Sequence, residues 1–135
     1  MARPLRIDHR GGWHHVMARG IDRRVIFADE RDHGHFLELL EGMVERYAVR
    51  LHAYVLMGNH YHLLVATPHA NLSRVMQWLN VSYSAWFNRR HGRVGPLLQG
   101  RFKSVLIDGE GSWALLASVY LHLNPVRVKG LGLDK

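Results

Sequence analysis

The sequence predicts an α+β fold in which strands and helices follow in the order βαββαβ, with one further helix near the C-terminus. Two strand-like apolar runs flank a Gly58-Asn59 pair, a favoured two-residue turn between antiparallel strands. Two other segments carry apolar residues at helical spacing. No linker, repeat or low-complexity stretch divides the chain, so residues 1–135 are expected to form one domain. This order of elements is typical of a ferredoxin-like antiparallel sheet.

The first half of the chain is expected to hold three strands and one helix. Residues 13–19 alternate well enough for a first strand, and an arginine-rich loop follows them. Residues 32–47 have the period of an amphipathic helix. Residues 51–57 and 60–67 are the two arms of the hairpin. The apolar positions of the helix are Phe36, Leu39, Leu40, Met43, Val44 and Tyr47.

The second half begins with a second amphipathic helix, for which Asn71 is the expected N-cap. A basic loop with several glycines follows at residues 89–100, and residues 101–108 form a fourth strand. The last helix covers residues 112–124, is apolar on nearly all sides, and is stopped by Pro125. The apolar stripe of the second helix is Leu72, Val75, Met76, Leu79, Tyr83, Trp86 and Phe87.

Two histidines stand two residues apart at the start of the third strand. Alternate side chains of a strand point to the same side, so His60 and His62 project together, close enough to share a metal ion. The turn at Gly58-Asn59 places His62 across from Val55 and His60 across from Met57, on an otherwise apolar face. A polar pair on such a face needs a partner. The spacing leaves two interpretations open, a metal site and a hydrogen-bonded histidine pair.

The last predicted helix carries a second pair of polar residues. Tyr120 and Asn124 are four positions apart and share one helical face, which would present a phenol beside an amide oxygen. A hydroxyl nucleophile beside a metal ligand is an arrangement suited to phosphoryl transfer. Other interpretations are open: Tyr120 could belong to the core, and Asn124 could be a helix end because a proline follows it.

The charge of the chain predicts a polyanionic partner. The formal net charge is +7, the sequence pI is about 10.4, and 15 Arg stand against 3 Lys. No Asp or Glu occurs from residue 46 to residue 107. The absence of cysteine excludes disulfides and thiolate metal sites, and no apolar run is long enough for a membrane span. A cytoplasmic, nucleoid-associated protein without membrane contacts is expected.

The motifs carry a resemblance to a known family. Gly58-Asn-His-Tyr-His-Leu-Leu64, with Tyr120-Leu-His-Leu-Asn-Pro-Val-Arg127 downstream, resembles the single-tyrosine HUH endonucleases, which include insertion-sequence transposases. More narrowly, the chain is similar to the REP-associated tyrosine transposases, and this similarity spans essentially its whole length. The motifs that carry it are Ala2-Arg-Pro-Leu-Arg-Ile7, His15-Val16 with Arg19-Gly20, Tyr54-Val-Leu-Met57, Phe87-Asn-Arg-Arg90 and Gln99-Gly-Arg-Phe-Lys103.

The resemblance implies a role for each matching residue. His60, His62 and Asn124 match the metal ligands, with Mg²⁺ or Mn²⁺ as the ion, and Tyr120 matches the nucleophile. The family cleaves single-stranded DNA at the foot of imperfect hairpins and leaves a 5′-phosphotyrosine and a free 3′ hydroxyl. The expected partner of this chain is single-stranded DNA with a hairpin, and the chain is expected to act as a monomer or homodimer. The residues expected to bind the DNA are Arg3, Arg6, Arg19, Arg23, Arg24, Arg89, Arg90, Arg93, Arg101 and Lys103.

Three functions are compatible with these residues. The favoured one is a metal-dependent endonuclease and strand transferase, a transposase acting on hairpin-flanked single strands. The main alternative is a non-catalytic module that binds DNA or RNA hairpins on the same fold, and a third is a nuclease that activates water while Tyr120 is structural. The joint presence of His60, His62, Tyr120 and Asn124 argues for retained chemistry.

Overall fold

The computed structural model describes residues 12–107. Within them the elements are β1 (Gly12–Arg19), the short 3₁₀ helix η1 (Ile21–Arg23), α1 (Glu30–Tyr47), β2 (Arg50–Leu56), β3 (His60–Thr67), α2 (Leu72–His91) and β4 (Lys103–Ile107). The predictions for Arg3, Arg6, Tyr120 and Asn124, and for the last helix, lie outside the described residues.

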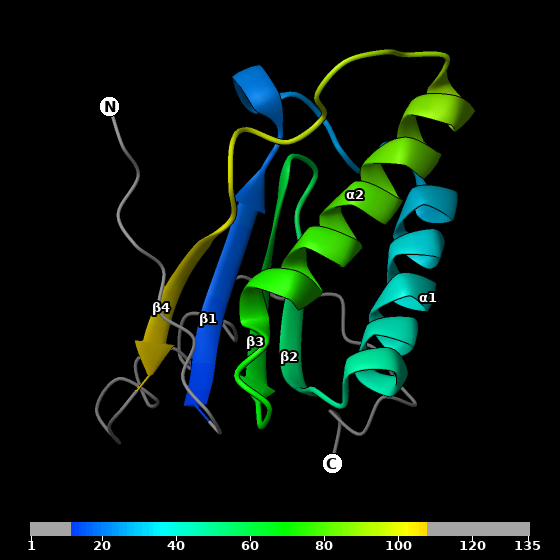
Figure 1. Ribbon diagram of the computed structural model, residues 1–135. Helices are drawn as coiled ribbons and strands as arrows, with labels where there is room; N and C mark the ends of the chain where they lie inside the picture. Colours follow the sequence, from blue (N-terminus) through cyan, green and yellow to red (C-terminus); the bar gives the residue numbers. More distant parts are fainter. Residues whose placement is uncertain (1–11, 108–135) are drawn as a thin grey trace.

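The four strands form one antiparallel sheet in the order β2-β3-β1-β4, and both helices lie on the same face of it (Figure 1). The predicted α+β class and the βαββαβ order are confirmed. The hairpin register is also confirmed, because Val55 pairs with His62 and the Met57 amide donates to the His60 carbonyl at 2.8 Å. Among the described residues no helix is both long and apolar enough to span a bilayer.

The helix boundaries follow from their caps. The side chain of Asp29 accepts a hydrogen bond from the Asp32 amide at 3.1 Å, so α1 begins two residues before the predicted start. Asn71 precedes α2 as predicted, but its side chain does not cap that helix and instead donates to the Tyr47 carbonyl at 3.3 Å. The end of α2 lies beyond the predicted loop start, because the left-handed Gly92 closes the helix after His91.

The main core lies between the sheet and the two helices. Side chains of β3 alternate between its two faces, so Tyr61, Leu63 and Val65 point toward the helices and are buried there. The Tyr83 hydroxyl on α2 donates to the Ile26 carbonyl, which ties the β1–α1 connection to the helix. A smaller buried cluster, centred on Val55 and Leu64, lies on the opposite face of the sheet. Truncation of a fully buried leucine in such a core costs about 2–5 kcal/mol.

Three connections meet at one end of the sheet, at the top of Figure 1. They are the β1–α1 connection (residues 20–29), the hairpin turn (residues 57–59) and the α2–β4 connection (residues 92–102), together called the loop end. Backbone hydrogen bonds join them: Ile26 donates to Gly58 at 2.8 Å, and Ile21 donates to Leu97 at 2.8 Å. Residues far apart in the sequence are therefore held together beside the start of β3.

Candidate metal and nucleic-acid site

His60 and His62 project from the start of β3 on the sheet face opposite the helices, here called the histidine face. Their neighbours Tyr61 and Leu63 point into the main core, which fixes the direction of both imidazoles. The two ring centroids are 5.0 Å apart, with the ring planes at 83°. Because a histidine nitrogen lies about 2.1 Å from a bound zinc-like ion, rings at this separation can share one. The predicted juxtaposition of the two rings is therefore present.

His62 has a partner that the sequence did not predict. Its Nδ1 lies 2.9 Å from Nε2 of His15, and the two rings stack at 16° with centroids 5.1 Å apart. His15 comes from β1, which pairs with β3 so that Met17 faces His62 and His15 faces Leu64. Only the pairing of β1 with β3 brings these two histidines together. His15 belongs to one of the motifs that carry the family resemblance, and no role is predicted for it from the sequence.

His60 is held by its neighbour Asn59. Nδ1 of His60 lies 2.8 Å from Oδ1 of Asn59. The opposite atom of the same amide, Nδ2 of Asn59, donates to the Arg23 carbonyl at 3.3 Å. In both His60 and His62, Nδ1 contacts another protein side chain. Nε2 is therefore the atom suited to bind an external ligand.

The three histidines are kept neutral by their surroundings. Burial, followed by the charges of His15 and His60, lowers the pKa of His62 to about 4. Burial and then the nearby charge of Arg19 lower the pKa of His60, and burial lowers the pKa of His15. A neutral imidazole is the form that binds a metal ion. At neutral pH both candidate ligands are therefore ready to bind without losing a proton.

Two of the three predicted metal ligands, His60 and His62, lie within residues 12–107, and both suit a divalent ion. Two neutral imidazoles with fixed Nδ1 partners are the kind of ligands that first-row divalent ions take, and their partners supply the outer contacts such ligands require. No cluster of three or more His, Cys, Asp or Glu in this part of the chain could hold a metal ion. A third protein ligand would have to come from elsewhere, and the predicted one is Asn124.

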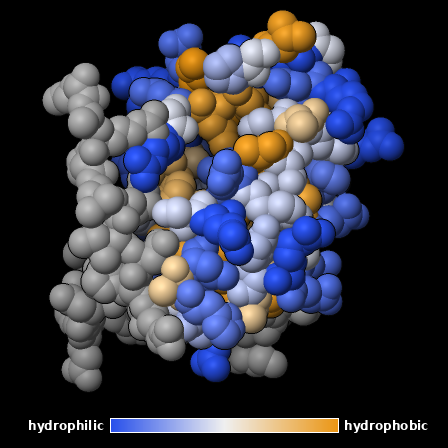
Figure 2. All heavy atoms as spheres, viewed as in Figure 1, coloured by the Kyte–Doolittle hydropathy of each residue, from blue (hydrophilic) through white to orange (hydrophobic). Residues whose placement is uncertain are grey.

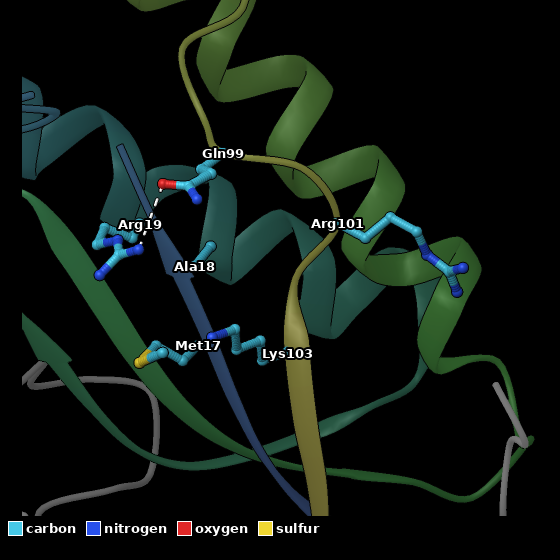
Figure 3. Close-up of a pocket in the computed structure, with 6 residues that line it drawn as sticks. All are labelled: Met17, Ala18, Arg19, Gln99, Arg101 and Lys103. Carbon is cyan, nitrogen blue, oxygen red and sulfur yellow. Dashed lines mark hydrogen bonds between the residues drawn. The ribbon is translucent and has the colours of Figure 1, made fainter. Parts of the chain in front are cut away.

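A basic pocket lies between the end of β1 and the start of β4 (Figure 3). It is small, about 50 Å³, and its lining contains cations without any acid. Arg19 stands opposite His60 in the β1–β3 register, and its Nη2 donates a hydrogen bond to Oε1 of Gln99 at 3.3 Å. In Figure 3 the Arg101 side chain extends away from Arg19 and Gln99. The lining residues are Met17, Ala18, Arg19, Gln99, Arg101 and Lys103.

The β1–α1 connection presents two further predicted arginines, Arg23 and Arg24, both exposed. The backbone there is unusual, because Asp22 and Arg23 are left-handed with φ of 53° and 59°. The tight turn also requires a glycine at position 20. A Cβ on Gly20 would overlap the Arg24 carbonyl oxygen and approach Cγ2 of Ile26 to 2.9 Å.

The predicted arginines after α2 differ in their surroundings. Arg90 pairs with Asp29 and the buried Asp32, each at 2.7 Å, so its charge serves to join the two helices. Arg93 stabilises the α2–β4 connection, since it donates hydrogen bonds to Oδ1 of Asn88 at 2.7 Å and to the Pro96 carbonyl at 3.0 Å. Arg89 is exposed. DNA binding by all three stays a prediction, and Arg90 is the one whose charge already has two carboxylate partners.

Figure 2 shows the face of the molecule over the two helices. Hydrophilic residues cover most of α1 and α2, and hydrophobic residues gather near the loop end. Val25 and Val94, which belong to two of the three connections there, have exposed fractions of 51% and 91%. The loop end thus combines exposed arginines with exposed apolar side chains.

Comparison with known families decides the class of the protein. A family model described as transposase, IS200-like, matches residues 10–104, more than half of the chain and nearly all of the described fold. The chain belongs to the IS200-like transposase family. It is thus a transposase by family, and the matched residues include the histidine pair and the basic pocket. A search of curated protein sequences finds no match.

Two solved structures share the fold of this transposase. One is a REP-associated tyrosine transposase bound to a REP hairpin, with a TM-score of 0.75 and 16% identity over 93% of this chain and 73% of that chain. The other, described as a candidate transposase from Deinococcus radiodurans R1, has a TM-score of 0.61 and 15% identity over 93% of this chain and 100% of that chain. At these identities the likeness establishes the fold.

Proposed function

We propose that this transposase is a metal-dependent single-stranded DNA endonuclease and strand transferase that acts at hairpin-flanked sites through a 5′-phosphotyrosine intermediate. The observation that carries the proposal is the neutral pair His60 and His62, each held through Nδ1, beside a pocket of cations. Membership of the IS200-like family supports the transposase class. The hairpin in the structure of the REP-associated relative supports hairpin DNA as the partner.

The histidines and the tyrosine have separate tasks in this mechanism. His60 and His62, with Asn124 as the third ligand, bind a divalent ion, Mg²⁺ or Mn²⁺. When bound, the ion supplies Lewis acidity to a phosphate oxygen and helps orient the attack. Asn59 and His15 hold the two imidazoles in place, so that the ligands do not have to reorganise when the DNA arrives.

The chemical step is an exchange of one phosphate ester for another. The phenol oxygen of Tyr120 attacks the phosphorus and loses its proton, the P–O3′ bond breaks, and the 3′ oxygen leaves as a hydroxyl after taking up a proton. The 5′ side of the DNA is then esterified to Tyr120. A 3′ hydroxyl can later attack the same phosphorus and release the phenol. Since one phosphate ester is exchanged for another in each step, rejoining needs no nucleoside triphosphate.

The single strand would reach the histidines through the loop end. Arg19, Lys103 and Arg101 line or flank the pocket next to His60, and Arg23 and Arg24 project from the adjoining connection. Arginine suits phosphate because its planar guanidinium can make two parallel hydrogen bonds to one phosphate group. The absence of acids from residue 46 to residue 107 leaves the hairpin turn and the α2–β4 connection free of carboxylates that would repel the DNA.

Covalent trapping with a tyrosine variant tests the proposal. Wild-type protein, incubated with Mn²⁺ and hairpin-flanked single-stranded DNA, should form an adduct that mass spectrometry assigns to the peptide containing Tyr120. Tyr120→Phe should bind the same DNA without cleaving it, because only the hydroxyl is lost, and Tyr47→Phe is the control that should cleave normally. Cleavage without any adduct would indicate a water-activating nuclease. Binding without cleavage by the wild type would indicate a non-catalytic hairpin-binding module.

A further inference from the structure

Asn59 makes two side-chain contacts that determine how its amide is oriented. The Arg23 carbonyl can only accept a hydrogen bond, so the amide atom that faces it at 3.3 Å must be the NH₂ group. The atom that faces Nδ1 of His60 at 2.8 Å is then the amide oxygen, which can only accept. Nδ1 of His60 must therefore carry the proton. The two contacts of Asn59 alone fix the tautomer of His60.

The Arg23 carbonyl is placed by the unusual backbone of its own connection. The left-handed conformations of Asp22 and Arg23 form a tight turn, and the Gly20 amide is bonded to the Asn59 carbonyl at 2.9 Å. The main chain and the side chain of Asn59 are thus both anchored to the β1–α1 connection. A backbone that departs from the common conformations is expected where the position of one group matters.

We infer that Asn59 is a positioning residue that holds His60 as the Nδ1–H tautomer, with Nε2 presented for metal binding, and that the Arg23 carbonyl locks the amide in the orientation this requires. Without the Arg23 contact, the Asn59 amide could turn over and offer its NH₂ group to His60, which would favour the other tautomer. The part of this inference that concerns the metal rests on the proposed function. The part that concerns the tautomer does not.

Two variants test the contacts of Asn59, and a third serves as the control. Asn59→Asp keeps an oxygen acceptor for His60 in either orientation but loses the donor to Arg23. Asn59→Ala removes both contacts. Asn88→Ala is the matched control, because Asn88 is also a two-sided loop anchor: it donates to the Gly95 carbonyl at 2.9 Å and accepts from Arg93 at 2.7 Å, without contacting a histidine.

The first readout is the tautomer of His60 in the metal-free protein, measured from the imidazole ¹⁵N chemical shifts. Wild type, Asn59→Asp and Asn88→Ala should all show the proton on Nδ1. Asn59→Ala should show a mixture of tautomers. The second readout is Mn²⁺ affinity by titration calorimetry, which should fall roughly 10–100-fold in Asn59→Ala and stay at the wild-type value in Asn88→Ala.

The wild-type spectrum alone can overturn the inference, so the test holds even if a variant fails to fold. A wild-type His60 protonated on Nε2 would show that Asn59 does not set the tautomer. An unchanged tautomer in a folded Asn59→Ala would do the same. Because the tautomer is measured without metal or DNA, failure of the proposed function would appear separately, as normal tautomer behaviour in a protein that neither cleaves nor joins DNA.

Discussion

His15 and His62 are joined across two strands: Nε2 of His15 lies 2.9 Å from Nδ1 of His62, although 47 positions separate them in the chain. Burial keeps His15 neutral by lowering its pKa, so its Nε2 can accept a hydrogen bond from the Nδ1–H group of His62. A metal-binding histidine is usually oriented by such a partner on its second nitrogen. His15 therefore has the position of an orienting residue for His62, and it belongs to the site without being one of its predicted ligands.

Replacement of His15 should weaken metal binding while DNA binding persists. His15→Ala is expected to lower Mn²⁺ affinity by roughly 10–100-fold, because His62 loses the partner that fixes its ring. His15→Gln, whose amide can still meet Nδ1 of His62, should recover part of the loss. His69→Ala removes an exposed histidine after β3 and serves as the control. Equal Mn²⁺ affinity in His15→Ala and the wild type would show that the contact has no such role.

The fold was predictable because its determinants are local. The Gly58-Asn59 turn sets the hairpin register, which the pairing of Val55 with His62 confirms, and the apolar stripes mark both helices. The boundaries were less predictable because they depend on caps. Asp29 extends α1 by its hydrogen bond to the Asp32 amide, and Asn71 turns its amide to the Tyr47 carbonyl instead of capping α2.

The candidate site was only half predictable for a related reason. The spacing of His60 and His62 follows from strand geometry, which sequence shows directly. The partnership of His15 with His62 depends on the register of two strands that are distant in the chain, and sequence periodicity does not contain that register. The pairing of Arg90 with Asp29 and Asp32 at the start of α1 was missed in the same way, since a basic residue before a loop looks the same whether it binds phosphate or a neighbouring helix.

The ligand set predicts which metal ion supports cleavage best. Imidazoles bind first-row divalent ions more readily than Mg²⁺, and no carboxylate occurs from residue 46 to residue 107 to offset this preference. Mn²⁺ should therefore support cleavage at a lower concentration than Mg²⁺, measured with a labelled hairpin-flanked oligonucleotide. His60→Ala and His62→Ala should abolish cleavage and retain DNA binding. Full activity of the wild type in excess chelator would contradict a metal role.

The ion pair of Arg90 with Asp29 predicts a loss of stability in acid. The hydrogen bond from Arg90, followed by that from the Asp32 amide, holds the pKa of Asp29 well below its usual range. A lowered pKa contributes stability above the ordinary carboxyl value of about 4, and this contribution is lost as the pH falls toward the pKa of the folded state. Asp29→Asn keeps a capping oxygen without the charge.

The measurement is the Tm of wild type and Asp29→Asn from neutral pH to about pH 3. The wild type should melt higher at neutral pH, and the two curves should approach each other below about pH 4. Glu41→Gln, which removes an exposed carboxylate from α1, controls for the change in net charge. A difference in Tm between wild type and Asp29→Asn that stayed constant across this range would contradict the assignment.

The basic pocket and the Arg90 pair should respond differently when their charges are removed. The logarithm of the affinity for single-stranded DNA should fall with the logarithm of salt concentration, with a slope of about −0.7 for each phosphate neutralised. If Arg19 and Lys103 each contact a phosphate, the Arg19→Gln/Lys103→Gln double variant should have a slope shallower by about 1.4. Arg31→Gln/Arg74→Gln removes two exposed charges from the helices and should leave the slope unchanged.

Arg90→Gln completes the comparison, because its charge is already committed to Asp29 and Asp32. Its loss leaves the buried Asp32 carboxylate with His91 and the Ala28 amide, so the variant should melt at a lower temperature while its salt slope stays close to that of the wild type. Titrations at several salt concentrations, with melting curves of each variant, measure both properties. An unchanged slope in Arg19→Gln/Lys103→Gln, together with a shallower slope in Arg90→Gln, would contradict DNA binding at the pocket. It would indicate that the DNA binds at the end of α2.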